Sequence, residues 1–148
     1  MHFAHESTIT CNGCGFVGIP RTTLTTGRPV IDPNSGLLSG LSVEDGTISI
    51  GPNGLDGRQS DYFDIISRAF ELNGVLQGKD VAVITGRNDV DYASRQVTAV
   101  KPDNGTAKPE FSIDSTALGD MYANTIKLVG TEKGGGVRAP ANVSSKNN

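Results

Sequence analysis

Short apolar runs recur along the chain, and residues that favour turns bound each of them. For example, Thr47–Ile50 alternates polar and apolar residues directly after Glu44-Asp45-Gly46. Because a strand buried on one face shows this period of two, the pattern predicts a many-stranded β protein. Further strands are expected at residues 23–25, 29–31, 41–43, 72–76, 81–84, 97–100, 111–113 and 126–129.

The glycine content narrows the choice of β architecture. Glycine accounts for 19 of 148 residues, aromatic residues for only 5%, and Trp is absent. Sandwiches and barrels usually carry longer strands and aromatic core anchors. Short strands with small, branched apolar residues favour a β-helix, in which each coil adds short strands to stacked parallel sheets, although no strict repeat is visible. Four Asn-Gly pairs supply residues that tolerate positive φ in tight turns, at Asn12, Asn53, Asn73 and Asn104.

Three segments stand outside this pattern. In residues 61–72, Phe63, Ile66 and Phe70 recur at helical spacing after a possible N-cap at Ser60 or Asp61, so the periodicity predicts a helix there. Residues 116–122 are expected to form one helical turn or a bulged corner. Residues 131–148 are rich in Gly, Ala, Pro, Asn and Ser, which is typical of a linker.

The apolar phase of the expected strands also predicts which side chains face the interior. These residues are Leu24, Val43, Ile48, Ile50, Val81, Val83, Ile113, Ile126 and Leu128.

Charge and hydropathy exclude several classes of function. The net charge is −3, the pI is near 5.3, and the basic residues are scattered singly. A nucleic-acid partner needs a concentrated positive face, so none is expected, and the chain does not resemble a membrane-surface protein. No run approaches the ~18 apolar residues of a spanning helix, so no direct membrane insertion is expected. The first residues also lack the features of a signal peptide.

The two cysteines, Cys11 and Cys14, form a single CxxC. A structural zinc site needs four ligands, and a thioredoxin-like motif precedes a helix, which the following residues do not open. Two alternatives remain: a short-loop disulfide, which requires an oxidising compartment, or two free thiols.

Catalytic constellations are weak. His2 and His5 are the only histidines, and a Cys14–His5 pair has no third residue to orient it. Two carboxylates on a β-helix face could cleave glycosides, but a solvated charged edge or turn aspartates are the favoured interpretation. We therefore predict no catalytic residue, no metal and no cofactor. The carboxylates concerned are Asp61, Asp64, Glu71, Asp89 and Asp91.

A series of motifs follows in a fixed order: Ile9-Thr10-Cys11-Asn12-Gly13-Cys14-Gly15-Phe16, Pro20-Arg21-Thr22-Thr23-Leu24-Thr25-Thr26-Gly27-Arg28-Pro29, Asp61-Tyr62-x-Asp64-Ile65-Ile66-x-Arg68-Ala69, Leu76-Gln77-Gly78-Lys79-Asp80-Val81, Thr85-Gly86-Arg87-Asn88-x-Val90, Leu118-Gly119-x-Met121-Tyr122-Ala123 and Ile126-x-Leu128-Val129-Gly130-Thr131-Glu132-x-Gly134. From about Ile9 to Val137, their order and spacing resemble the haemagglutination-activity domain of two-partner secretion exoproteins. That family includes filamentous haemagglutinins, haemolysins and contact-dependent growth inhibition adhesins.

The resemblance implies an all-β, right-handed parallel β-helix with extra-helical strands, and it makes residues 61–72 strand, against their periodicity. It implies a secretion domain of a large adhesin or haemagglutinin. Such a domain crosses the periplasm, is recognised by the periplasmic domains of an outer-membrane β-barrel transporter and is exported to the cell surface. Receptors on host or neighbouring cells are further possible partners. In that oxidising route Cys11 and Cys14 form a disulfide. The partner-recognition residues expected around it are Ile9, Thr10, Asn12, Gly13, Gly15 and Phe16.

The chain departs from the family pattern near its start. An Asn-Pro-Asn-Gly-Ile-type motif is usual before the cysteines, and here the positions read His5-Glu6-Ser7-Thr8-Ile9. Later, Gly135 replaces a usual Val, and Asp120 stands where Gly is common. We therefore expect a frayed N-terminus at residues 1–8, a partial domain at 9–137 that is incomplete at its N-terminal end, and a flexible tail or linker at 138–148. If the chain is a piece of a longer secreted protein, the absence of a signal peptide from it does not argue against secretion.

Two alternatives remain beside the secretion domain. One is a polysaccharide-active β-helix enzyme that uses Asp61 and Asp64, or Asp89 and Asp91. The other is an inactive fragment from a truncated gene.

Overall fold

The computed structural model describes residues 2–3, 8–16, 18–102 and 121–131. Within these residues, the regular structure consists of sixteen strands and contains no helix. The strands are β1 (His2–Phe3), β2 (Thr8–Cys11), β3 (Cys14–Gly15), β4 (Arg21–Thr25), β5 (Arg28–Ile31), β6 (Leu38–Val43), β7 (Thr47–Ile50), β8 (Leu55–Asp56), β9 (Tyr62–Ser67), β10 (Ala69–Leu72), β11 (Leu76–Gln77), β12 (Asp80–Thr85), β13 (Asn88–Asp91), β14 (Val97–Val100), β15 (Met121–Tyr122) and β16 (Thr125–Gly130).

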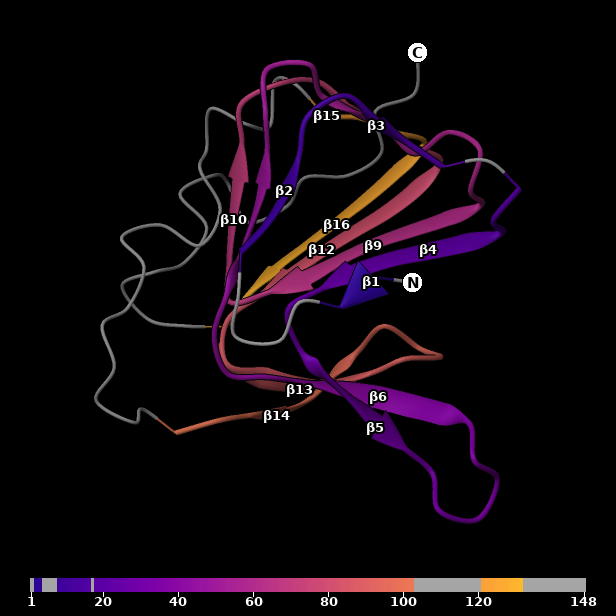
Figure 1. Cartoon of the computed structure of the whole chain (residues 1–148). Helices are drawn as coiled ribbons and strands as arrows, with labels where there is room; N and C mark the ends of the chain where they lie inside the picture. Colours follow the sequence, from indigo (N-terminus) through magenta and orange to yellow (C-terminus); the bar gives the residue numbers. More distant parts are fainter. Residues whose placement is uncertain (1, 4–7, 17, 103–120, 132–148) are drawn as a thin grey trace.

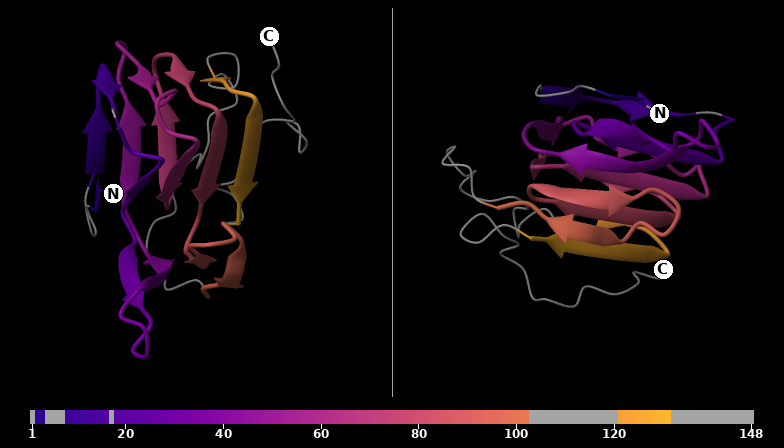
Figure 2. Two further views of the ribbon diagram at one scale, coloured as in Figure 1. Left: turned by 90° about the vertical axis from the view of Figure 1, so that its right-hand side faces the viewer. Right: turned by 90° about the horizontal axis from the view of Figure 1, so that it is seen from below.

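Three parallel sheets form the body of the molecule. Sheet A has the order β1-β4-β9-β12-β16, sheet B β10-β7-β2 and sheet C β15-β11-β8-β3. The chain visits sheets B, C and A in turn, as in β7-β8-β9 and β10-β11-β12, so each circuit stacks on the previous one. Figure 2 shows these circuits as successive layers from indigo to yellow. The fold is a parallel β-helix, as the resemblance implies.

The main core lies inside the β-helix. Six of the side chains expected to face the interior are at most 3% exposed within it: Leu24, Ile48, Ile50, Val81, Val83 and Ile126. Leu128 is half-buried and packs against this cluster. Ile113 lies outside the described residues.

A fourth sheet lies outside the β-helix and confirms the extra-helical strands. Sheet D has the order β14-β13-β6-β5 and is antiparallel throughout. Its two hairpins, β5–β6 and β13–β14, branch from the β-helix after β4 and after β12. The two hairpins are joined because β6 pairs with β13 (Figure 1). A second apolar cluster lies where sheet D meets the outer face of sheet A, formed by Leu41, Val43, Ile66, Ile84 and Val90. Val43 is therefore buried as expected, but in this second core.

The burial of sheet A on both faces explains why the β9 part of residues 61–72 does not show the alternation of a strand. Ile65 packs in the main core and Ile66 in the second core, so apolar residues stand next to each other instead of alternating. The segment forms β9 and β10, so the strand that the resemblance implies is confirmed, and the helix that the periodicity predicts is wrong.

Other expected boundaries move by a few residues. The run 72–76 is not one strand, because β10 ends at Leu72, β11 begins at Leu76, and Asn73-Gly74 turns the chain between them. β1 lies in the segment expected to be frayed, where it pairs with β4. The expected strand at 111–113, residues 116–120 and the tail from 132 lie outside the described residues.

Candidate recognition site at the disulfide corner

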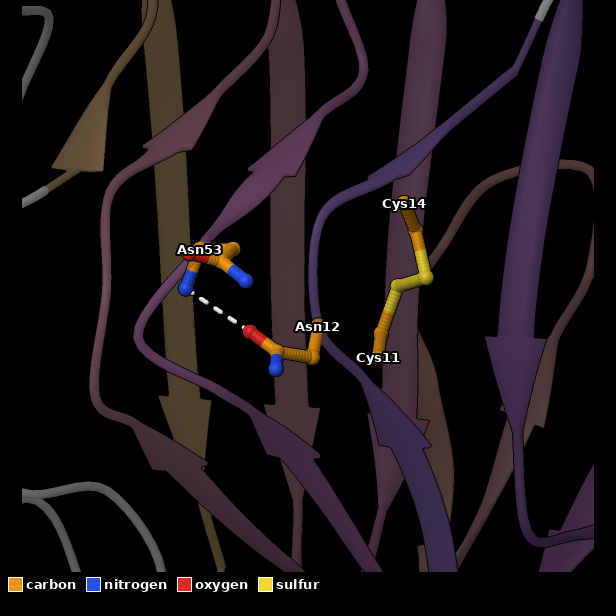
Figure 3. The surroundings of a disulfide bond; sticks show 4 residues. All are labelled: Cys11, Asn12, Cys14 and Asn53. Atoms are coloured by element: carbon orange, nitrogen blue, oxygen red, sulfur yellow. Dashed lines mark hydrogen bonds between the residues drawn. A yellow bond between two sulfur atoms is a disulfide. The ribbon is translucent and has the colours of Figure 1, made fainter.

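Cys11 and Cys14 stand at the corner between β2 and β3. Their Cα atoms are 5.6 Å apart, and the structure brings the two sulfur atoms into bonding contact (Figure 3). Such a Cα separation is usual for a disulfide. Gly13 closes the turn between them with φ +79°, a conformation that Gly adopts without steric cost. The arrangement favours the disulfide over two free thiols.

Backbone hydrogen bonds attach this corner to the next coil. Gly13 N donates to Gly54 O at 2.8 Å, and Gly51 N donates to Cys11 O at 2.8 Å. The side chain of Asn12 adds a third link, because its Oδ1 accepts from Asn53 N at 2.7 Å (Figure 3). The corner is therefore held in one shape by its neighbour.

The same corner recurs in the next coils, where Asn53-Gly54 and Asn73-Gly74 follow β7 and β10. The coils approach closely there, since a Cβ at Gly74 would lie 2.3 Å from the carbonyl oxygen of Gly51. Three of the four Asn-Gly pairs thus mark one corner of the β-helix, and the fourth, at Asn104, lies outside the described residues.

A hollow of about 570 Å³ opens beside the cysteines. Ile9, Thr10, Gly15 and Phe16 line it together with the two cysteines and Leu24. Phe16 also packs on Phe63, with ring centroids 5.5 Å apart. Four of the six predicted recognition residues therefore come together around one hollow. The other two, Asn12 and Gly13, lie exposed in the adjoining turn.

The backbone around this site lies at the margin of two sheets. β2 is the outer strand of sheet B, and β3 is the outer strand of sheet C, among the strands that the structure describes. Thr10 and Gly15 on these strands are exposed. An outer strand offers unpaired backbone groups to which an extended segment can bind.

Asp64 does not lie on a solvated edge, which corrects the interpretation made from the sequence. It is fully buried, and its Oδ2 accepts from Arg21 Nε at 2.8 Å and from Thr23 Oγ1 at 2.9 Å. Its Oδ1 lies 2.7 Å from Arg95 Nε, without hydrogen-bonding geometry, so that contact is an ion pair. Two arginines neutralise this carboxylate, which gives the enzyme alternative no support.

The remaining carboxylates lie at the surface. Asp61 is exposed, and its carboxylate lies 3.5 Å from Lys79 Nζ. Asp91 accepts from the Ser94 side chain and backbone, which lowers the pKa of its carboxyl. Asp91 is thus a turn aspartate, as expected from the sequence.

Arg21 and Arg95 are the functional candidates that sequence reasoning missed. Arg21 and Asp64 both lie in motifs that carry the family resemblance, and this shared position was the only signal in the sequence that could have linked them. Arg95 stands in no motif, and only the fold places it beside Asp64, since the β13–β14 hairpin turns back over sheet A.

The described residues hold no group of three or more His, Cys, Asp or Glu side chains suited to a metal ion. In the same part of the chain, no helix is long and apolar enough to span a membrane.

A family model described as "TPS secretion domain" matches residues 6–148. The chain belongs to this family of two-partner secretion domains. Such a TPS secretion domain serves export and is not itself an enzyme, and exoproteins of this type pass through the periplasm to the cell surface. Family, function and localisation therefore agree with the expectations drawn from the sequence.

Curated relatives are much longer proteins. The chain is 52% identical over 129 residues to "16S rRNA endonuclease CdiA" of Enterobacter cloacae subsp. cloacae, and 49% identical over 129 residues to "tRNA nuclease CdiA" of Yersinia mollaretii. Each match covers 87% of this chain but 4% of the relative. The nuclease activities in these names belong to other parts of those proteins.

A solved structure confirms the fold. The crystal structure of the filamentous hemagglutinin secretion domain matches with a TM-score of 0.77 and 36% identity. The match covers 89% of this TPS secretion domain and 46% of that chain.

Proposed function

We propose that the disulfide corner and its outer strands are the surface by which this domain is recognised by the periplasmic domains of a cognate outer-membrane β-barrel transporter. The observation that carries the proposal is the gathering of Ile9, Thr10, Gly15 and Phe16 around one apolar hollow. Asn12 and Gly13 lie exposed beside it, and the backbone of β2 and β3 lies at a sheet margin.

The mode of recognition that this surface supports is strand addition. An extended segment of the transporter pairs with β2 or β3, and its apolar side chains enter the hollow. The disulfide keeps the corner in one shape and so lowers the ordering cost of binding. The unit that takes part comprises residues 9–137, with 138–148 as a linker to the remainder of a large adhesin or haemagglutinin. Receptors on host or neighbouring cells are met only after export.

A binding assay tests the proposal. The probe is the purified periplasmic portion of the cognate outer-membrane transporter, and binding is measured by biolayer interferometry. Thr10→Arg places a long charged side chain at the hollow, and we expect the Kd to rise by about tenfold or more. Thr98→Arg is the matched control, because Thr98 is exposed on sheet D, away from the corner.

The wild-type chain is the reference for both variants. Equal loss of binding in both, or full binding by Thr10→Arg, would place recognition elsewhere on the domain. If the wild type and both variants all failed to bind the probe, recognition by this transporter would be overturned altogether.

A further inference from the structure

The turn between β13 and β14 contacts four successive strands of sheet A. The guanidinium of Arg21 on β4 donates to the carbonyl oxygen of Tyr92 and stacks 3.7 Å above the centroid of the Tyr92 ring. Lys127 on β16 donates from its Nζ to the carbonyl oxygen of Arg95 at 3.0 Å. The turn thus reaches from the first to the last of these four strands.

Arg95 supplies the two contacts between these ends. Its Nε lies 2.7 Å from Asp64 Oδ1 on β9, and its terminal nitrogen donates to Asp80 Oδ1 on β12 at 2.8 Å. The side chain of Arg95 is 13% exposed and that of Asp64 is fully buried. Water therefore screens the Asp64 pair only weakly.

The backbone at Arg95 adopts an unfavourable conformation. Its φ is +62°, and no other non-glycine residue in the described part of the chain has positive φ. Residues other than Gly, Asn or Asp rarely adopt this left-handed backbone conformation, and the surrounding contacts must hold Arg95 in it. Arg95 is thus both the residue with the strained backbone and one partner of the buried ion pair.

The apolar contribution of the β13–β14 hairpin is small by comparison. Val90 is buried in the second core and Val97 is half-buried, whereas Thr98, Ala99 and Val100 are exposed. At its base the hairpin follows Gly86, whose φ of +113° allows a sharp change of direction. A segment with few buried apolar side chains opens at a lower free energy than the core it covers.

From these observations we infer that the β13–β14 hairpin is a strap that closes over sheet A, with Arg95 as its latch and Gly86 at its hinge. In the closed state the strap links four coils of the β-helix, each of which otherwise contacts only its neighbouring coils. Opening breaks the pairing of β13 with β6 and uncovers part of the outer face of sheet A, including the Asp64 carboxylate, while the β-helix stays folded. The device is a property of the fold and does not depend on the proposed transporter.

Hydrogen exchange of the full chain, followed by mass spectrometry, tests this inference. In Arg95→Ala we expect the amides of β13 and β14 to exchange at least about tenfold faster, while those of β7 and β8 keep wild-type protection. Arg58→Ala is the matched control, because Arg58 pairs with Asp56 at an exposed site and its loss removes the same charge.

A second variant separates the latch from the strain. Arg95→Gly removes the ion pairs and also the cost of positive φ, so it should open the strap less than Arg95→Ala does, but more than the wild type. A uniform increase in exchange over all four sheets would show that Arg95 supports only global stability and would overturn the strap. Unchanged exchange in β13 and β14 would overturn it as well.

Discussion

Cys11 lies directly opposite Ile50 in the parallel register of β2 and β7, and the two side chains are 3% and 0% exposed. Cys14 lies opposite Leu55 in the same way. In the coil formed by β2 and β3, two sulfur atoms therefore occupy the positions that aliphatic side chains occupy in the next coil. The cysteines serve both as a cross-link and as part of the apolar stack.

The disulfide gives the first prediction. Protein purified from the periplasm should contain no free thiol, and Cys11→Ala/Cys14→Ala should lower the free energy of unfolding by about 1–2 kcal/mol, because the closed loop is short. Cys11→Ser/Cys14→Ser should cost about 1 kcal/mol more, since Ser at position 11 buries a hydroxyl in an apolar stack. Thiol titration and urea unfolding measure both. Two titratable thiols in the wild type would contradict the cross-link.

The second prediction concerns the main core. Ile48→Ala and Ile126→Ala should each lower the free energy of unfolding by roughly 2–4 kcal/mol, because both side chains are almost fully buried. Val75→Ala is the control, since Val75 is 42% exposed, and should change it by less than about 0.5 kcal/mol. Chemical denaturation followed by circular dichroism measures all three. Changes below about 0.5 kcal/mol at both isoleucines would refute the register.

The third prediction concerns the second core. Ile84 faces out of the β-helix, opposite in phase to Val83, yet it is fully buried against the residues of sheet D. Ile84→Ala should therefore cost roughly 2–4 kcal/mol, as much as a change in the main core. If sheet D did not cover sheet A, Ile84→Ala would lower the free energy of unfolding only as little as a substitution at an exposed residue does. The same denaturation experiment distinguishes the two outcomes.

The fourth prediction concerns pH. Hydrogen bonds from the Arg58 side chain and backbone lower the pKa of Asp56 from its usual 3.8 to about 2. A lowered pKa in the folded state contributes stability above pH 3.8, and that contribution is lost as the pH falls towards 2. Because both side chains are largely exposed, it should stay below about 1 kcal/mol.

Arg58→Ala should return the pKa of Asp56 towards 3.8, and NMR titration of the carboxyl carbon measures it. A pKa that stays near 2 in the variant would mean that another group holds the carboxylate charged.

The sequence by itself determined much of the strand content and the position of one corner. Thr47–Ile50 alternates, so the buried phase at Ile48 and Ile50 follows from the period of two. Asn-Gly pairs mark a recurring corner, and Gly adopts positive φ in two of them, at Gly13 and Gly54. These features depend only on neighbouring residues, and for that reason they can be read locally.

The tertiary structure alone decided the rest. The periodicity of residues 61–72 misleads because sheet D covers the outer face of sheet A at β9, where Ile65 and the adjacent Ile66 are buried on opposite faces. Likewise, nothing near Asp64 in the sequence identifies it as buried, because its partners Arg21 and Arg95 come from other strands and turns. The cost of burying a carboxylate is offset only when distant cations arrive, and chain topology, not local sequence, brings them there.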